Sequence, residues 1–269
     1  MTPEEKQKKL LSHLGSLGNV AVAFSGGVDS TYLLWAAREA LGARALALTV
    51  ASDFVPRREL DRAETFCRER GIPLTVVPVD VLAVPGVADN PPDRCYLCKK
   101  ALFTHLWEAA RERGFSTLAE GSNADDDGDY RPGLRAVREL NAASPLREAG
   151  LTKAEIRVLS RAAGLPTWDK PSLACLASRV PYGDRITEDK LSMADQAELT
   201  LLDRGFSQVR VRIHGNMARI EVSPAELQKL VDLRTEIAAE LRRIGFAYVT
   251  MDLEGYRTGS LNEVLHERG

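Results

Sequence analysis

The sequence has few cysteines, almost no net charge and no strongly apolar character. Four cysteines among 269 residues are too few for a disulfide scaffold, so we expect reactive, metal-binding or buried thiols. The 36 basic residues nearly balance 38 acidic ones, and the net charge of −2 lacks the basic excess that non-specific nucleic-acid binding needs. A mean hydropathy of −0.20 excludes a transmembrane chain. Residues 1–16 carry no secretory signal, so we expect a cytoplasmic protein.

Apolar runs alternate with amphipathic segments over the first two thirds of the chain. The runs are continuously apolar, as in parallel strands that are covered on both faces. The expected strands are 20–24, 45–50, 74–79 and 117–120, and the expected helices are 30–41, 56–70, 95–113 and 152–163. This alternation predicts an α/β fold, a doubly wound parallel sheet that binds its ligand at the carboxyl ends of the strands.

A different pattern follows residue 182. A helix is expected at 187–204, and two alternating strands, 208–213 and 217–222, flank a Gly-Asn hairpin turn. A serine and a proline at 223–224 predict a long helix to residue 243, followed by a third strand at 246–251. We therefore expect two domains: an α/β domain at 1–182 and a small α+β domain at 183–269.

The first expected strand runs directly into Ser25-Gly26-Gly27-Val28-Asp29-Ser30, and a helix follows at once. Gly26 and Gly27 allow backbone N–H groups to approach an anion closely, and the two serines add hydroxyl donors. The start of the helix contributes partial positive charge. Asp29 would repel phosphate by itself, so we expect it to orient the loop or a metal ion. The hexapeptide predicts a phosphate-binding loop.

Cys95 and Cys98 open the third expected helix at positions i and i+3, so both sulfurs lie on one side of it. The helix dipole and nearby basic residues favour the thiolate form there. A redox pair, half of a zinc site or two buried thiols are the alternatives that this spacing leaves open. Cys175 has small and apolar neighbours, yet we place it at the rim of the nucleotide cleft. Arg179 follows it and could hold a phosphate in bidentate fashion.

The loop sequence SGGVDS resembles the signature of the PP-loop, or N-type, ATP pyrophosphatases and lacks the lysine of the Walker pattern. Three further segments follow it in order: GSNADDDGDYRPG at 121–133, CLASR at 175–179 and VRVRIHGNMARIEV at 209–222. Together they resemble the LarE-type ATP-dependent sulfur transferases of nickel-pincer nucleotide synthesis. The resemblance covers nearly the whole chain.

This resemblance implies that ATP adenylylates a carboxylate of pyridinium-3,5-biscarboxylic acid mononucleotide, and that sulfur replaces AMP to give a thiocarboxylate. Cys175 matches the cysteine that gives up its own sulfur in some family members. The additional CxxC matches the branch in which three cysteines hold a 4Fe–4S cluster, and it implies Cys95, Cys98 and Cys175 as ligands. The resemblance also implies a homo-oligomer, with a hexamer as one state, and a C-terminal domain for substrate binding or assembly.

Other residues are assigned by position. Gly121, Arg179, Arg210 and Arg212 complete the expected nucleotide and substrate site, and the last two share one strand face. The acidic run 125–129 follows the fourth strand, and it fits Mg²⁺·ATP binding and a solvated loop equally well.

Four residues are expected to have no direct role in the chemistry. We expect Glu198 and Glu221 on a solvated surface, His214 in a turn, and Cys67 on the core face of its helix.

Two other functions remain open from the sequence. A tRNA thiolase would use the same ATP module, although the pI of about 6.2 and the absence of a basic domain argue against it. A nucleotide-binding iron–sulfur or zinc sensor would bind ATP without releasing pyrophosphate.

Overall fold

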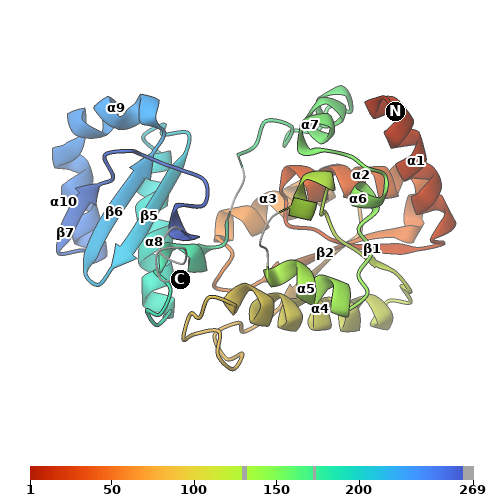
Figure 1. The fold of residues 1–269 in the computed structure, drawn as a ribbon, viewed down its shortest axis with the longest axis horizontal. Coiled ribbons are helices and arrows are strands. Elements are labelled where there is room, and N and C mark those ends of the chain that lie inside the picture. Colours follow the sequence, from red (N-terminus) through yellow and green to blue (C-terminus); the bar gives the residue numbers. More distant parts are fainter. Residues whose placement is uncertain (129–131, 172–173, 263–269) are drawn as a thin grey trace. The chain divides into compact units, whose positions relative to one another are not determined.

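The computed structural model describes residues 1–128, 132–171 and 174–262, and the chain forms two compact units (Figure 1). The first unit combines Met1–Val81 with Cys95–Leu173, and the second combines Leu82–Arg94 with Ala174–Gly269. These compact units do not coincide with the expected domains at 1–182 and 183–269, because the segment from residue 82 to 94 packs with the later chain. As a division of function, the expected boundary stays a prediction.

The first unit is built on a four-stranded parallel sheet with the strand order β3-β2-β1-β4. Its strands are β1 (Val20–Ala23), β2 (Ala45–Ala51), β3 (Leu74–Pro78) and β4 (Leu118–Ala119). Its helices are α1 (Pro3–Ser16), α2 (Val28–Leu41), α3 (Arg57–Glu69), α4 (Arg94–Glu112), α5 (Pro132–Glu139), α6 (Pro145–Glu148) and α7 (Lys153–Ala162). Helices α1, α2 and α7 cover one face of the sheet, and α4 and α5 lie on the other (Figure 1). The expected α/β fold is confirmed.

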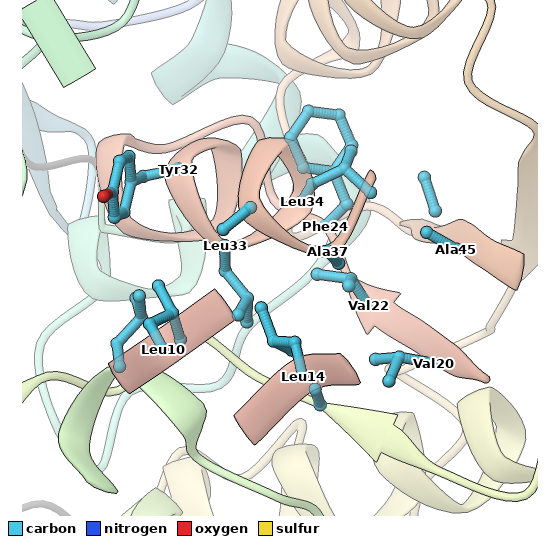
Figure 2. Packing of buried hydrophobic residues seen from close by; sticks show 14 of the residues in the cluster. Leu10, Leu14, Val20, Val22, Phe24, Tyr32, Leu33, Leu34, Ala37 and Ala45 are labelled. Carbon is cyan, nitrogen blue, oxygen red and sulfur yellow. The ribbon is translucent and has the colours of Figure 1, made fainter. Parts of the chain in front are cut away.

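The core of this unit lies between the sheet and α1, α2, α3 and α7. Figure 2 shows Leu10 and Leu14 of α1 near Leu33 of α2, with Val20 and Val22 of β1 beside them. All five side chains are 0% exposed, which explains why β1 reads as a continuous apolar run instead of an alternating one. This packing fixes the end of β1 and the start of α2, between which the phosphate loop lies.

The second unit contains a three-stranded sheet with the order β5-β6-β7. Its elements are α8 (Glu188–Leu202), β5 (Val209–His214), β6 (Met217–Val222), α9 (Leu227–Asp232), α10 (Arg234–Ile244) and β7 (Tyr248–Met251). Strands β5 and β6 form the expected hairpin, and β7 pairs with β6 in parallel. Helices α8, α9 and α10 contribute to one apolar core with the sheet.

Two expectations about elements need correction, and two helices were missed. The helix expected from 223 to 243 is divided, because the chain turns at Leu233, whose φ of −90° and ψ of 6° lie between helical and extended geometry. Helix α2 begins at Val28, two residues before the expected start, since Gly27 is its N-cap. Helices α5 and α6 were not expected.

Candidate active site

The phosphate loop has the geometry that its glycines predict. Gly26 has a φ of +68°, a conformation that residues with a Cβ rarely adopt, and Gly27 caps α2 without any side-chain hydrogen bond. The hydroxyl of Ser30 lies 3.1 Å from that of Ser25 and accepts a 3.3 Å hydrogen bond from the Ser25 backbone N–H. Ser25 itself is exposed. The loop thus exposes Ser25 to solvent, while Gly27 and Asp29 are half-buried.

Asp29, in the first turn of α2, is held by two residues from distant parts of the chain. Its Oδ2 forms an ion pair with Nζ of Lys153, the first residue of α7. Its Oδ1 accepts a 3.4 Å hydrogen bond from Nδ2 of Asn123. Asp29 was expected to orient the loop or a metal ion. In the structure, its carboxylate links α2 to the loop after β4 and to α7.

A second lysine supports the other side of the loop. Nζ of Lys170 donates a 2.8 Å hydrogen bond to the backbone oxygen of Gly26 and a 2.6 Å bond to Oε2 of Glu59 in α3. The side chains of Lys170 and Glu59 are 13% and 6% exposed. Because this pair is largely buried and binds the loop backbone directly, it maintains the turn at Gly26.

Gly121 allows the segment after β4 to lie directly against the phosphate loop. A Cβ at this position would lie 3.0 Å from the backbone nitrogen of Ser30 and 3.3 Å from Cβ of Asp29. The structure therefore places Gly121 beside the loop, as a position where only a glycine fits without displacement. Its predicted contact with the nucleotide stays a prediction.

The acidic run has partners within the first unit. Oδ2 of Asp125 accepts a 2.8 Å hydrogen bond from the backbone N–H of Lys153, and Oδ2 of Asp126 accepts a 2.9 Å bond from that of Asn123. The side chain of Asp127 and the whole of residue 129 lie outside the described residues. Two of these carboxylates thus order the loop next to Asp29, and the predicted Mg²⁺ contact of the run stays a prediction.

A cavity of about 510 Å³ opens beyond the carboxyl ends of β2 and β3. Ser52, Asp53, Arg57 and Asp80 supply polar groups to its wall, and Leu60 and Val79 supply apolar surface. Strand β2 is the neighbour of β1, which leads into the phosphate loop. A cavity at this edge of a parallel sheet lies where α/β proteins bind their ligands.

The four cysteines are all free thiols in different surroundings. Cys95 is half-buried and Cys98 is buried, one turn apart near the start of α4, as the helix expected there predicts. Cys175 is exposed in the second unit. Cys67 lies in the core at 1% exposure, which confirms its predicted position, and burial raises the pKa of its thiol to about 12.

The two cysteines of the CxxC belong to the first unit, and Cys175 belongs to the second. Within the described parts of the chain, no three histidine, cysteine, aspartate or glutamate side chains come together as a metal site. Thiols one helical turn apart fit two ligand positions of an iron–sulfur cluster by their chemistry. A cluster held by all three cysteines stays a prediction.

A buried arginine organises the turn that follows Cys175. Nη1 of Arg179 donates to the backbone oxygens of Ala174 and Cys175 at 2.9 and 3.1 Å. Its Nε and Nη2 bind the carboxylate of Glu198 in α8 at 2.6 and 2.9 Å. Burial acts to lower the pKa of the Arg179 guanidinium, whereas Glu198, Cys175 and Glu221 act to raise it, and the net shift is upward. The predicted role of Arg179 as a phosphate ligand stays a prediction.

Arg210 and Arg212 share one buried face of β5. Nε and Nη2 of Arg212 form two 3.0 Å hydrogen bonds with Glu221 of β6, and its Nη1 donates to the backbone oxygen of Ser178 at 2.6 Å. The pKa of Arg210 is lowered by burial and by the nearby charge of Arg179. These arginines therefore gather beneath the turn that carries Cys175, and their predicted contact with the substrate stays a prediction.

Glu198 and Glu221 are not the surface residues that we expected. They are 2% and 0% exposed, because each is the carboxylate partner of a buried arginine. His214 ends β5 next to the hairpin turn, as expected, and burial lowers its pKa.

Lys153 and Lys170 were missed by the sequence analysis. They lie 124 and 144 residues from their partners in the phosphate loop. Thr152 and Glu155 do form a capping box that marks the start of α7, so the position of Lys153 on a helix start could have been recognised. Nothing local in the sequence connects either lysine with the loop.

A phosphate loop between β1 and α2 of a parallel sheet defines the class as a PP-loop α/β protein. Relatives of this class support the assignment: one subunit of the glutamine-hydrolysing GMP synthase of Methanococcus maripaludis is 28% identical over 65% of this chain and 60% of its own length. No family model matches the chain.

Two relatives match almost the full length. An uncharacterised protein of Synechocystis sp. is 42% identical over 97% of this chain and 98% of its own length. The pyridinium-3,5-bisthiocarboxylic acid mononucleotide synthase of Lactiplantibacillus plantarum is 36% identical over 97% of this chain and 95% of its own. The chain belongs to this LarE-type family of ATP-using PP-loop enzymes. Within the described ranges, no helix combines the length and apolarity needed to cross a membrane.

Proposed function

We propose that the protein is an ATP-dependent sulfur transferase that converts a carboxylate of pyridinium-3,5-biscarboxylic acid mononucleotide into a thiocarboxylate. The similarity to the Lactiplantibacillus plantarum synthase carries this proposal, since it extends over both compact units at 36% identity. The geometry of the phosphate loop supports the use of ATP. The product of such a reaction is a precursor of the nickel-pincer nucleotide.

The first step is adenylylation. A carboxylate oxygen of the substrate attacks the α-phosphorus of ATP, the bond between this phosphorus and the β-phosphate bridging oxygen breaks, and pyrophosphate leaves. Residues 25–30 bind the phosphates through N–H groups and hydroxyls. We assign the adenosine to the cavity beyond β2 and β3, whose wall includes the carboxylates of Asp53 and Asp80 as acceptors for ribose hydroxyls. Among the described residues, we assign Asp29 and Asp125 as carboxylates that would hold Mg²⁺, an ion that would neutralise phosphate charge when bound.

The second step is the replacement of AMP. A sulfur nucleophile attacks the acyl carbon, and the bond from this carbon to the AMP oxygen breaks. Among the residues that the structure describes, three buried arginines, Arg179, Arg210 and Arg212, gather around two buried carboxylates, Glu198 and Glu221. We assign the excess positive charge of this cluster to the phosphate of the mononucleotide, near the turn that carries Cys175.

Cys175 is the residue assigned to sulfur transfer. It is the one exposed thiol of the four, so a substrate can reach it. Cys95 and Cys98 are proposed to join it as ligands of a 4Fe–4S cluster, which would supply sulfide when bound and spare the protein's own sulfur. The alternative is sacrifice of the Cys175 sulfur, which leaves dehydroalanine.

The function is tested with anaerobically purified protein, Mg²⁺·ATP and the biscarboxylate nucleotide, by measuring pyrophosphate and thiocarboxylate. Cys175→Ala is expected to abolish thiocarboxylate formation and keep ATP binding, and Cys67→Ala is the matched control that retains transfer. Sulfur transfer that requires tRNA and ignores the pyridinium nucleotide would identify a thiolase instead. ATP binding without pyrophosphate release would identify a sensor.

The sulfur source is decided by the mass of the protein after one cycle. A loss of H₂S at Cys175 shows sacrifice, and an unchanged mass shows that the sulfur came from elsewhere. If a cluster is used, Cys95→Ala and Cys98→Ala also abolish transfer, and full activity in either variant rejects it. Iron content and charge-transfer absorption separate a cluster from zinc.

We also propose a cytoplasmic homo-oligomer that needs no nucleic acid, with a hexamer as the expected state. Native mass spectrometry tests the assembly, and a monomer at working concentration would reject it.

A further inference from the structure

Lys170 contacts the phosphate loop at a single peptide oxygen. Its Nζ donates a 2.8 Å hydrogen bond to the backbone oxygen of Gly26 and a 2.6 Å bond to Oε2 of Glu59. The other oxygen of this carboxylate, Oε1, accepts a 2.8 Å bond from Nη1 of Arg62. The side chains of Lys170 and Glu59 are largely buried. The ammonium group is therefore engaged by a carboxylate and a peptide of the first unit, and its charge is balanced there.

The backbone of Lys170 is held in place without help from the loop. Its N–H donates to the backbone oxygen of Thr167 at 3.0 Å. Arg157 of α7 donates to the backbone oxygens of Trp168 and Lys170 at 2.7 and 2.8 Å. Because α7 and a turn of its own fix the backbone of Lys170, its side chain can impose a geometry on the loop.

The peptide between Gly26 and Gly27 needs such a constraint. Neither residue has a Cβ, so this peptide rotates more freely than a peptide between residues with side chains. The bond is trans, and its oxygen and its N–H therefore point in opposite directions. A hydrogen bond to the oxygen of Gly26 consequently directs the N–H of Gly27 away from Lys170 and Glu59.

The N–H of Gly27 is a donor that an anion can use. Gly27 is the N-cap of α2, and its own backbone oxygen accepts a 3.0 Å hydrogen bond from the N–H of Thr31. Within the described ranges, no residue accepts a hydrogen bond from the N–H of Gly27. Such N–H groups at a helix start bind phosphate oxygens. If the peptide had the opposite orientation, its carbonyl oxygen would face the anion and repel it.

We propose that Lys170 is a positioning residue for ATP: its ammonium group selects the orientation of the Gly26–Gly27 peptide in which the N–H of Gly27 donates to a phosphate oxygen. The hydrogen bond to the carbonyl also polarises the amide, which strengthens its N–H as a donor. Lys170 itself stays with Glu59 and does not bind the nucleotide. This inference rests on the ATP-binding part of the proposed function and deepens it, and it is independent of the sulfur chemistry.

The sequence offers a selective probe of this peptide. Gly26 and Gly27 form the one Gly-Gly pair among the 269 residues. In protein that contains glycine labelled with ¹³C at the carbonyl and with ¹⁵N, the NMR correlation through the peptide bond gives a single signal, from this pair. The carbonyl shift of the signal reports the hydrogen bond from Lys170, and the amide proton shift reports a hydrogen bond from Gly27 to phosphate.

The experiment compares the full chain with Lys170→Met. The ligands are the α,β-methylene analogue of ATP with Mg²⁺ and, as a ligand without phosphate, adenosine. In calorimetry, Lys170→Met should weaken binding of the analogue by roughly ten- to a hundredfold, as expected for the loss of one charged hydrogen bond, and change adenosine binding less than about twofold. Glu59 keeps Arg62 as a partner in this variant, so its charge stays compensated.

The NMR signal separates positioning from direct binding. In the unaltered chain, the amide proton of Gly27 should shift downfield at saturating analogue, and in Lys170→Met this shift should be lost. Lys170→Arg keeps a charged donor and should restore part of the affinity and part of the shift. The matched control is Lys6→Met, because Lys6 forms an ion pair with Glu155 in the same unit, at 18% and 21% exposure.

Selective loss of analogue binding together with loss of the proton shift supports the proposal. Unchanged binding, an equal loss of both ligands, or a similar loss in Lys6→Met would each overturn it. Weaker binding that keeps the full proton shift at saturation would make Lys170 a direct phosphate ligand and would also overturn it. An unaltered chain whose Gly27 proton does not move on binding refutes the proposal without any variant.

The same measurements separate this inference from the proposed function. An unaltered chain that binds the analogue but forms no thiocarboxylate would reject the sulfur-transferase function and leave the role of Lys170 standing. An unaltered chain that does not bind the analogue overturns both.

Discussion

Replacing Glu198 by leucine should destabilise the second unit strongly. The Glu198 carboxylate accepts hydrogen bonds from Nε and Nη2 of Arg179 and from the backbone N–H of Val211 at 3.1 Å, and both charged side chains are 2% exposed. Glu198→Leu leaves a buried guanidinium without its anion, which costs about 3–5 kcal/mol. The unpaired N–H of Val211 adds to this cost.

A double variant tests whether the loss of stability comes from the buried charge of Arg179. In the double variant Arg179→Met/Glu198→Leu the guanidinium that loses its anion is removed as well, so we expect the double variant to be more stable than Glu198→Leu alone. A loss of stability in the double variant that equals the sum of the two single losses would show that the ion pair contributes no coupling. The argument from burial would then be wrong.

Hydrogen exchange of the β5 and β6 amides is the suitable assay, because it reports local opening of the second unit. A loss of about 3 kcal/mol accelerates exchange by roughly a hundredfold. All three tryptophans, Trp35, Trp107 and Trp168, lie in the first unit, so tryptophan fluorescence in urea is an internal control that should barely change. If the β5 and β6 amides of Glu198→Leu exchange at rates within about threefold of those in the unaltered chain, the reasoning is refuted.

The remaining predictions concern Gly121, the thiols of Cys67 and Cys175, and the helix cap at Thr152. Gly121→Val should weaken binding of the α,β-methylene analogue of ATP by roughly five- to a hundredfold, because its Cβ would lie 3.0 Å from the backbone nitrogen of Ser30. An affinity that calorimetry finds unchanged would contradict this. At pH 8, iodoacetamide should modify Cys175 and spare Cys67, whose thiol pKa burial raises to about 12; peptide mass spectrometry detects either outcome. Because folding raises that pKa from 9.0, Cys67 favours the folded state less as pH rises above 9. Thr152→Ala should cost about 1 kcal/mol in urea unfolding through the lost cap of α7, and a zero cost would contradict the capping assignment.

Features encoded by neighbouring residues could be predicted. The glycine turn after β1, the β5–β6 hairpin and the core position of Cys67 each depend on a few consecutive side chains, and the structure confirms them. Strands β1 and β2 were recognisable because almost all of their residues are buried, which produces a continuous apolar run of definite length.

Features that depend on distant residues could not be predicted. Glu198 has the charge of a surface residue, and only the approach of Arg179 explains why it is buried. The same holds for Lys153, whose partner Asp29 is 124 residues away. The capping residues at the start of α7 are recognisable in the sequence, but the sequence does not show which loop that helix contacts.

The segment Leu82–Arg94 has a consequence for making fragments of this protein. Its Asn90 donates to the backbone oxygens of Val180 and Pro181 at 3.1 and 2.6 Å, and its Arg94 donates to that of Ala177 at 3.1 Å. A gene fragment that begins after residue 173 would encode the second sheet but leave these carbonyls without their donors. The chain therefore has no single cut that separates one unit intact from the other, and exchanging the second unit between relatives requires transplanting two stretches together.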